Sequence, residues 1–406
     1  MKTILFCLLG ILSLALAQQS RIAFISPEGQ LSTINPDGSN LRILTEGEKR
    51  FQFPAWSPDG SKIAAIGVDQ AGGFIEILPD SDSATAKEIY RSAHQGVIYL
   101  YWSPDSSMVS FLANHPSSNL ALHLASETQE DRILIEGAPF YWQWASDNQN
   151  LLIHTQFTGE DSRLGFTSLE SDTLTENLAP PGIFQAPGIS PSETYIAYAE
   201  DNPVRGTQVI IQNNPLSNAP TLRREIKHEG AVGLSWSPTE DTLAFISPNE
   251  DAARVYGPLK LLEAESGLLE DLTESVVLAF FWSPDGKYIA YISPLNSQEP
   301  DISETRQEQL ITQKIQQSFL FEVRVIDVKS KEDRVIGTFT PSFQFVTQFL
   351  PFFDQYALSH SIWSPQSDAV VLTTIDAQNA EKITVFSLDG SAQIIADGDT
   401  PFWNKK

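Results

Sequence analysis

Trp56-Ser57-Pro58-Asp59-Gly60 and Trp282-Ser283-Pro284-Asp285-Gly286 are two copies of one short pattern, and this pattern decides the fold. In each copy the proline fixes φ early in a turn and the glycine accepts a positive φ later in it. The second copy is followed by an apolar run at 287–292 of the kind that forms a β-strand. The pattern therefore predicts a short strand, a tight turn and a second strand.

Copies of this pattern recur along the chain at a nearly constant spacing. The marker positions are Trp56, Trp102, Trp144, Ile189, Trp236, Trp282 and Trp363, with Trp403 as the last. The intervals between them are 46, 42, 45, 47, 46, 81 and 40 residues. A unit of about 45 residues that holds four short strands is typical of a propeller blade. We therefore predict an all-β fold, a β-propeller of eight four-stranded blades, as a single domain over 20–406.

Closure of the ring follows from where the strands begin and end. The chain enters its first blade at the second strand, and 400–403 can supply the missing first strand. Pairing the C-terminal strand with the N-terminal strands would remove two exposed sheet edges. The interval of 81 residues before Trp363 leaves room for a ninth degenerate blade or for insertions. We favour insertions, because 321–327 and 333–339 already complete the blade that begins at Trp282.

The N-terminal segment 1–17 has the features of a secretory signal peptide. Lys2 precedes the apolar stretch 4–16, and Ala15-Leu16-Ala17 resembles a cleavage site. The single cysteine, Cys7, lies inside this segment, so the mature chain would carry no thiol for disulfides or metal binding. No window approaches the roughly 20 apolar residues of a membrane span. We expect a periplasmic or extracellular protein, cleaved near Ala17.

The charge of the chain excludes some classes of partner. It has 51 acidic and 26 basic residues and a formal net charge of −25. Such a surface repels the phosphates of nucleic acids and the headgroups of anionic lipids, but it tolerates cations, basic peptides and neutral glycans. We expect a monomer with no nucleic-acid ligand, whose partner is a protein, a peptide or a cell-envelope polymer.

The long connections are expected on one face of the ring. The Trp-Ser-Pro turns join first strands to second strands, so they share a face with the turns between third and fourth strands. The long segments 249–257, 295–318 and 340–360 fall on the other connections and therefore on the opposite face, termed here the long-loop face. Loops carried by a rigid scaffold commonly hold the functional residues. This face is the predicted binding surface.

The two largest insertions differ in composition. The pattern in 295–318 predicts a helix, with apolar residues near helical spacing. The segment 340–360 is rich in aromatic residues and predicts a loop; it is either a small satellite core beneath that helix or an exposed platform for a sugar ring or a peptide. The predicted binding residues are Phe353, Asp354, Tyr356 and His360.

The Trp-Ser-Pro-Asp-Gly units, together with the stretch 34–45 (INPDGSNLRILT), resemble the repeats of TolB-type propellers, which are relatives of WD-repeat propellers. The resemblance covers nearly all of 20–406, and the matching residues form turns and blade contacts. It implies a propeller whose family includes a periplasmic protein-binding component. Similar repeats occur in front of prolyl-oligopeptidase-type hydrolases and in a lyase that acts on pectin fragments.

Signatures of catalysis are scarce in the sequence. It contains no Gly-x-Ser-x-Gly elbow, phosphate-binding loop or His-Glu-x-x-His helix, and we name no catalytic residue. The resemblance to the lyase implies a ring of histidines that holds a divalent metal, for which the candidates are His94, His115, His154, His228 and His360. His94 and His228, however, each stand eight residues before a marker tryptophan, which favours a role in shaping a loop.

Two functions of different classes remain open. The first is a secreted or periplasmic, non-catalytic TolB-like scaffold that needs no cofactor and binds its partner through the long-loop face. The alternative is a metal-assisted carbohydrate lyase or hydrolase of the uronate type. It would require at least three of the five histidines to meet, because metal–nitrogen bonds are only about 2 Å long.

Overall fold

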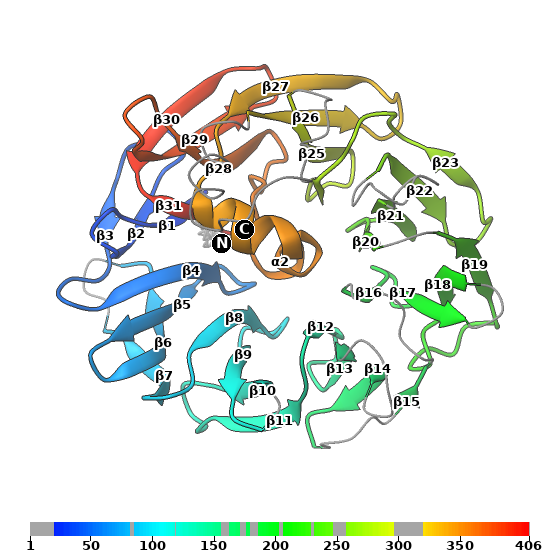
Figure 1. Ribbon diagram of the computed structural model, residues 1–406, viewed down its shortest axis with the longest axis horizontal. Coiled ribbons are helices and arrows are strands. Elements are labelled where there is room, and N and C mark those ends of the chain that lie inside the picture. Colours follow the sequence, from blue (N-terminus) through cyan, green and yellow to red (C-terminus); the bar gives the residue numbers. More distant parts are fainter. Residues whose placement is uncertain are drawn as a thin grey trace, which may run out of the picture.

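The computed structural model describes residues 20–81, 85–117, 119–155, 162–170, 176–178, 186–202, 206–228, 231–246, 257–295 and 320–405. Eight sheets stand side by side around a central axis (Figure 1). The prediction of an all-β, eight-bladed propeller is thus confirmed. The predicted signal peptide 1–17 lies outside the described residues, as do nearly all of the insertion 295–318 and the loop 249–257. Among the described residues, no helix has the length and apolar character needed to cross a bilayer.

In the first four blades the first strand lies nearest the axis, and blades 2 to 4 are formed in chain order (Figure 1). Blade 1 contains β31 (Asp399–Trp403), β1 (Ile22–Ile25), β2 (Leu31–Ile34) and β3 (Arg42–Ile43). Blade 2 contains β4 (Arg50–Trp56), β5 (Lys62–Asp69), β6 (Gly72–Pro79) and β7 (Lys87–Ser92). Blade 3 contains β8 (Val97–Trp102), β9 (Val109–His115), β10 (Asn119–Ala125) and β11 (Arg132–Glu136). Blade 4 contains β12 (Phe140–Trp144), β13 (Asn150–Thr155), β14 (Arg163–Ser168) and β15 (Glu176–Asn177).

The second half of the ring continues in the same order. Blade 5 contains β16 (Gly188–Ile189), β17 (Tyr195–Asn202), β18 (Gly206–Asn213) and β19 (Arg223–Lys227). Blade 6 contains β20 (Gly233–Trp236), β21 (Thr242–Ile246), β22 (Leu259–Glu263) and β23 (Leu269–Asp271). Blade 7 contains β24 (Ala279–Trp282), β25 (Tyr288–Pro294), β26 (Phe321–Asp327) and β27 (Asp333–Phe339). Blade 8 contains β28 (Ala369–Ile375), β29 (Glu381–Ser387) and β30 (Ala392–Asp397).

Blade 8 departs from the four-stranded prediction. Its innermost position holds no full strand; Ser361 bridges to Trp403, and Trp363 bridges to Val370. The reason is the segment that precedes it, which is helical up to residue 359 and leaves only a few residues extended. Because β26 and β27 belong to blade 7, the long interval before Trp363 holds insertions and not a ninth blade, as predicted.

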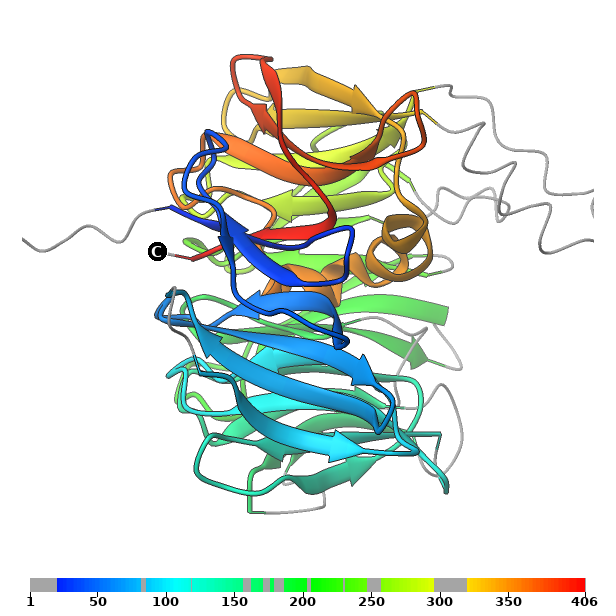
Figure 2. The same ribbon diagram turned by 90° about the vertical axis from the view of Figure 1, so that its left-hand side faces the viewer.

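The ring closes between the two ends of the chain. β31 pairs antiparallel with β1, with Phe402 opposite Ala23. One step beyond, the Asn404 backbone N–H donates to the Arg21 carbonyl at 2.9 Å, and the Arg21 N–H donates to Asn404 Oδ1, also at 2.9 Å. Figure 2 shows β31 beside the N-terminal strands in the edge-on view. The predicted closure is confirmed, and two sheet edges are thereby covered.

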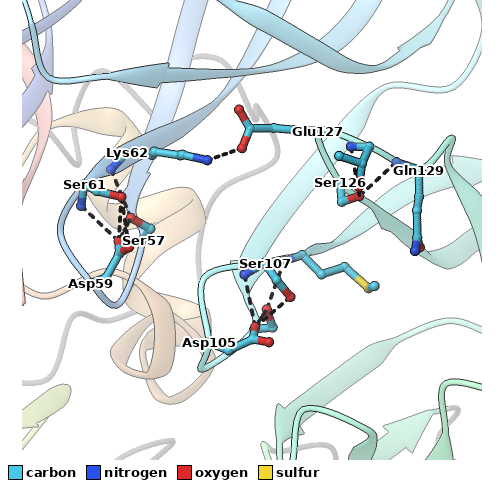
Figure 3. A network of polar contacts seen from close by, with 12 residues as sticks. Ser57, Asp59, Ser61, Lys62, Asp105, Ser107, Ser126, Glu127 and Gln129 are labelled. Atoms are coloured by element: carbon cyan, nitrogen blue, oxygen red, sulfur yellow. Dashed lines mark hydrogen bonds and ion pairs between the residues drawn. The ribbon is translucent and has the colours of Figure 1, made fainter.

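The Ser-Pro turns are held by their own side chains (Figure 3). The Ser57 hydroxyl donates to Asp59 Oδ1 at 2.6 Å, and Asp59 Oδ1 also accepts the Ser61 backbone N–H at 3.0 Å. The Ser57 oxygen accepts the Lys62 N–H at 3.0 Å. Partial burial acts to raise the pKa of Asp59, but these hydrogen bonds outweigh it and leave the pKa below its usual value. The Asp105 turn of blade 3 repeats the arrangement, so the motif forms the same turn in both blades.

Five of the marker tryptophans join their blade to the preceding one. In four blades the indole N–H donates to the carbonyl of the residue just before the preceding blade's marker. These bonds are Trp56 Nε1 to Phe402 O (3.1 Å), Trp102 Nε1 to Ala55 O (3.0 Å), Trp282 Nε1 to Ser235 O (3.2 Å) and Trp363 Nε1 to Phe281 O (2.9 Å). Trp144 makes the same link through Ser110, whose hydroxyl accepts its N–H at 2.9 Å and donates to the Tyr101 carbonyl at 2.8 Å. This contact accounts for the tryptophan at that position of the repeat in these five blades.

Candidate functional site

The segment between blades 7 and 8 is helical and enters the channel of the ring. It consists of η1 (Phe345–Phe349), a π-helix, η2 (Leu350–Phe352), a 3-10 helix, and α2 (Phe353–Ser359). At the start of this helical segment, the Ser342 hydroxyl accepts the Phe345 backbone N–H at 3.2 Å. Figure 1 shows α2 in the middle of the ring, beside the inner strands. We term residues 343–359 the plug.

The prediction of an aromatic loop over 340–360 is therefore corrected. The channel of an eight-bladed ring is wide, and its inner strands offer apolar side chains and backbone groups that need partners. The plug fills this space with Phe345, Phe349, Phe353 and Tyr356, all between 2% and 6% exposed. Their spacing of four, four and three residues is that of one helix face, and this signal was present in the sequence.

Two of the predicted binding residues pack as core side chains. The Tyr356 ring lies 5.2 Å from Phe53 and 5.0 Å from Tyr99, measured between ring centroids. Phe353 lies 5.2 Å from Phe280 in the same measure. Its ring also comes so close to β20 that a Cβ at Gly233 would stand 2.7 Å from its Cζ. These aromatic rings fix the plug in the channel and do not form an exposed platform.

Gln355, which is not among the predicted binding residues, binds the plug to blade 4. Its side-chain oxygen accepts the Trp142 backbone N–H at 3.0 Å, and its Nε2 donates to the Trp142 carbonyl at 2.8 Å. The Tyr99 hydroxyl donates to the Gln355 carbonyl at 2.9 Å. The amide of Gln355 thus pairs with the inner strand β12 as a neighbouring strand would. This pairing joins residues 213 positions apart, so no local sequence pattern predicts it.

The predicted residue His360 lies at the end of α2 and is 1% exposed. Its Nδ1 is 2.6 Å from the Ser359 hydroxyl oxygen, and its Nε2 is 3.5 Å from the Phe53 carbonyl oxygen. Burial lowers the pKa of His360 to about 3, because the imidazolium form would lose its hydration. The imidazole is therefore neutral at physiological pH.

Asp354 is 5% exposed and is the fourth predicted residue. Its Oδ2 accepts the Ala186 backbone N–H at 3.1 Å, and its Oδ1 accepts the Gln355 N–H at 2.9 Å. Burial raises the pKa of this carboxyl to about 6, although the two hydrogen bonds act in the opposite direction. Among the described residues no basic side chain forms an ion pair with it, and at neutral pH the carboxylate is mostly ionised.

A cavity of about 480 Å³ opens beside α2. Its rim includes the turn prolines Pro191, Pro238, Pro284 and Pro365, so it opens on the face of the Ser-Pro turns; we term it the turn-face cavity. Most of the residues that line it are apolar, and Asp354 is among them. This cavity thus lies opposite the face that the loop lengths favoured, next to the part of the channel that the plug fills.

The five histidines of the metal alternative stand apart. His94 is exposed in the loop before β8, His115 and His154 lie on β9 and β13, His228 follows β19, and His360 is inside the channel. Within the part of the chain that the structure describes, no three His, Cys, Asp or Glu side chains gather so that they could hold a metal ion. We therefore derive no step through a metal.

Comparison with known proteins supports the fold. No protein-family model and no curated protein sequence matches the chain. Among solved structures it is similar to TolB from Acinetobacter baumannii, at 15% identity and a TM-score of 0.42, over 95% of this chain and 67% of that one. It is similar to an oligogalacturonate lyase in complex with manganese, at 12% identity and a TM-score of 0.53, over 91% and 96%. It is also similar to a eukaryotic initiation factor, at 13% identity and a TM-score of 0.54, over 95% of this chain and 99% of that one. At such identities the likeness shows the β-propeller fold alone.

Proposed function

We propose that the chain is a non-catalytic scaffold that binds a segment of a protein, a peptide or an envelope polymer in the turn-face cavity. The observation that carries this proposal is the cavity itself. It is concave, largely apolar and of the size that small ligands and peptide tips occupy. Its walls are inner strands and α2, and buried hydrogen bonds such as those of Gln355 hold α2 in place. A rigid hollow of this kind binds without a large cost in ordering.

This proposal moves the binding surface away from the long-loop face. The residues expected at an exposed mouth, Phe353 and Tyr356, are 3% and 2% exposed inside the channel. A partner on the long-loop side could not reach them without displacing the plug. A partner on the turn side meets an open cavity, at whose wall Asp354 already stands.

The test compares two tryptophan substitutions on opposite faces. Ala357→Trp places a large ring in the turn-face cavity, whereas Ala93→Trp places it on an exposed loop of the long-loop face. Ligands are first selected for the wild-type protein from a displayed library of random short peptides and from an array of envelope glycans. We expect Ala357→Trp to abolish binding of the selected ligands and Ala93→Trp to preserve it.

The reverse result would return the binding surface to the long-loop face and end the proposal in this form. Thermal unfolding of both variants shows whether each ring remains folded, so that a loss of binding is not a loss of structure. Selection of no ligand at all by the wild-type protein would also count against a binding scaffold.

We also propose that the protein works in the periplasm or outside the cell. The support is the pattern in 1–17, where Lys2, an apolar stretch and Ala15-Leu16-Ala17 follow one another. N-terminal sequencing of protein recovered from outside the cytoplasm should give a chain that begins at Gln18. A chain that is found only in the cytoplasm with Met1 retained would contradict export.

A further inference from the structure

Asp354 carries a charge that the described part of the fold does not balance. Its carboxylate lines the turn-face cavity, accepts two backbone N–H groups and has no ion-pair partner among the described residues. We infer that the turn-face cavity receives a lysine or arginine side chain of a peptide partner, whose cationic end pairs with Asp354. This inference rests on the proposed function, because it specifies what the cavity binds.

The energetic argument concerns burial of an uncompensated charge. An ionised carboxylate that leaves water without a counter-charge destabilises a fold, and two backbone N–H groups offset only part of that cost. The raised pKa of Asp354, about 6, reflects the same imbalance. A bound ammonium or guanidinium would supply the missing charge in a site where water screens little, so the ion pair would be stronger than one at the surface.

The walls of the cavity suit the rest of such a side chain. Leu234 on β20, Phe281 on β24 and Ala357 on α2 all line it. Lysine and arginine bury their methylene stems along apolar surface of this kind while the charged end finds a polar partner. The rings of Trp236 and Trp282 also line the cavity, and aromatic faces attract cations.

The charge of the whole chain favours the same class of partner. A formal net charge of −25 raises the concentration of basic peptides around the protein and speeds their association. Because salt screens this long-range attraction, the association rate should fall as ionic strength rises. The contact with Asp354 itself is enclosed and should depend less on salt.

Three other titratable groups line the cavity with Asp354. His360 is neutral, because burial lowers its pKa to about 3. Burial raises the pKa of Tyr101 above its usual value, so its phenol is neutral as well. Lys405 is exposed, and its Nζ donates to the Leu358 carbonyl at 3.0 Å. Lys405 is the group that would attract an anionic ligand, so it serves as the internal control.

The experiment titrates the full mature protein with capped amino acids, followed by NMR or calorimetry. The probes are Nα-acetyl-arginine methylamide and its lysine, norleucine and glutamate counterparts. The Asp354→Asn variant keeps an acceptor for the Ala186 N–H and removes the charge. We expect the cationic probes to bind the wild-type protein, and to bind Asp354→Asn at least about tenfold more weakly. Norleucine should bind both proteins equally, and Lys405→Ala should bind the cationic probes at least as well as the wild type.

Protonation provides a second readout. Because a bound cation favours the ionised carboxylate, affinity for the cationic probes should decrease as the pH falls below about 6, the pKa of Asp354. The Asp354→Asn variant should show no such decrease. A fall in affinity of the same size in both proteins would mean that another group titrates.

Several results would overturn the inference without touching the proposed function. Equal binding of the cationic probes to wild type and Asp354→Asn would remove Asp354 from recognition, as would failure of those probes to bind at all. Binding of capped glutamate that disappears in Lys405→Ala would show that the cavity takes anions. If Ala357→Trp abolishes binding of selected peptides while Asp354→Asn preserves it, the cavity is the binding site but the basic side chain is not its ligand.

Discussion

Trp102 and Trp236 occupy the same position of the repeat but differ in one hydrogen bond. The indole N–H of Trp102 donates to the Ala55 carbonyl at 3.0 Å, whereas that of Trp236 is buried with no partner among the described residues. We expect Trp102→Phe to lower the free energy of unfolding by about 1–2 kcal/mol more than Trp236→Phe does. The reason is that only the first substitution removes a bond between blades.

Chemical denaturation of the two variants measures this difference. Each loses the same part of an indole ring, and both tryptophans are at least nine-tenths buried, at 3% and 8% exposure, so the packing terms largely cancel. Equal losses would show that packing alone, and not the hydrogen bond, gives tryptophan its place in the repeat.

His360 and Asp354 should have opposite effects on stability in acid. As the pH falls below 6.5, the unfolded chain protonates its histidine while His360, with a pKa of about 3, stays neutral in the fold, so stability decreases. Between about pH 6 and 3.8 folded Asp354 takes up a proton that the unfolded chain does not, so stability increases. The two effects offset each other between about pH 6 and 4.

Substituting either residue should therefore change the slope of the unfolding free energy against pH. In Asp354→Asn, stability should fall more steeply from pH 6 to 4 than in the wild type, by up to about 1.4 kcal/mol per pH unit. In His360→Gln it should fall less steeply, by a similar amount. Urea denaturation across this pH range measures both slopes, and parallel profiles for the three proteins would disprove the assignment.

At the level of elements, the plug should contribute to stability through its buried face. The Phe349 ring lies 5.7 Å from Phe281 and 5.0 Å from Tyr356, centroid to centroid, and is 4% exposed. Phe349→Ala should therefore cost about 3–5 kcal/mol of unfolding free energy. Phe343 begins the same helical segment but is 46% exposed, and Phe343→Ala should change stability by less than about 0.5 kcal/mol.

Denaturation midpoints of the two variants check this prediction. Both substitutions remove the same side chain from one segment, so the comparison isolates burial. If Phe349→Ala were as mild as Phe343→Ala, the plug would be loosely held and the blades would be stable without it.

The elements differ in how far the sequence predicts them. Strands and turns follow from local signals, because Ser57 and Asp59 form their turn with each other and need nothing distant. The plug has a helical spacing of aromatic residues, but its place in the channel depends on Gln355 and Trp142, which are far apart in sequence. The predicted residues Asp354 and His360 do line a cavity, yet on the face that loop length disfavoured, because loop length says nothing of where the channel is filled.

For the whole molecule, the counted repeat was enough to predict the ring. Closure of the ring depends on the last strand. β31 is the innermost strand of blade 1, and its Phe402 carbonyl accepts the indole N–H of Trp56. Deletion of 399–406 should expose the edge of β1 and open the ring. We expect a lower melting temperature, faster proteolysis and association in size-exclusion chromatography.

Deletion of 405–406 alone is the matched control, because it leaves β31 and the paired residues Arg21 and Asn404 in place. That variant should remain monomeric and melt close to the full chain. A monomeric, protease-resistant protein without 399–406 would mean that the seven other blades hold the ring shut unaided.

The pairing of β31 with β1 also sets the order in which the molecule can be finished during synthesis. β1, β2 and β3 leave the ribosome before the other described strands, but the strand that completes their sheet is made after the seven other blades. Until Asp399–Trp403 arrives, the first blade is a three-stranded sheet with an open inner edge. Blade 1 therefore stays incomplete for longer than the other blades. A nascent chain that stalls before β31 is made exposes the unpaired edge of β1.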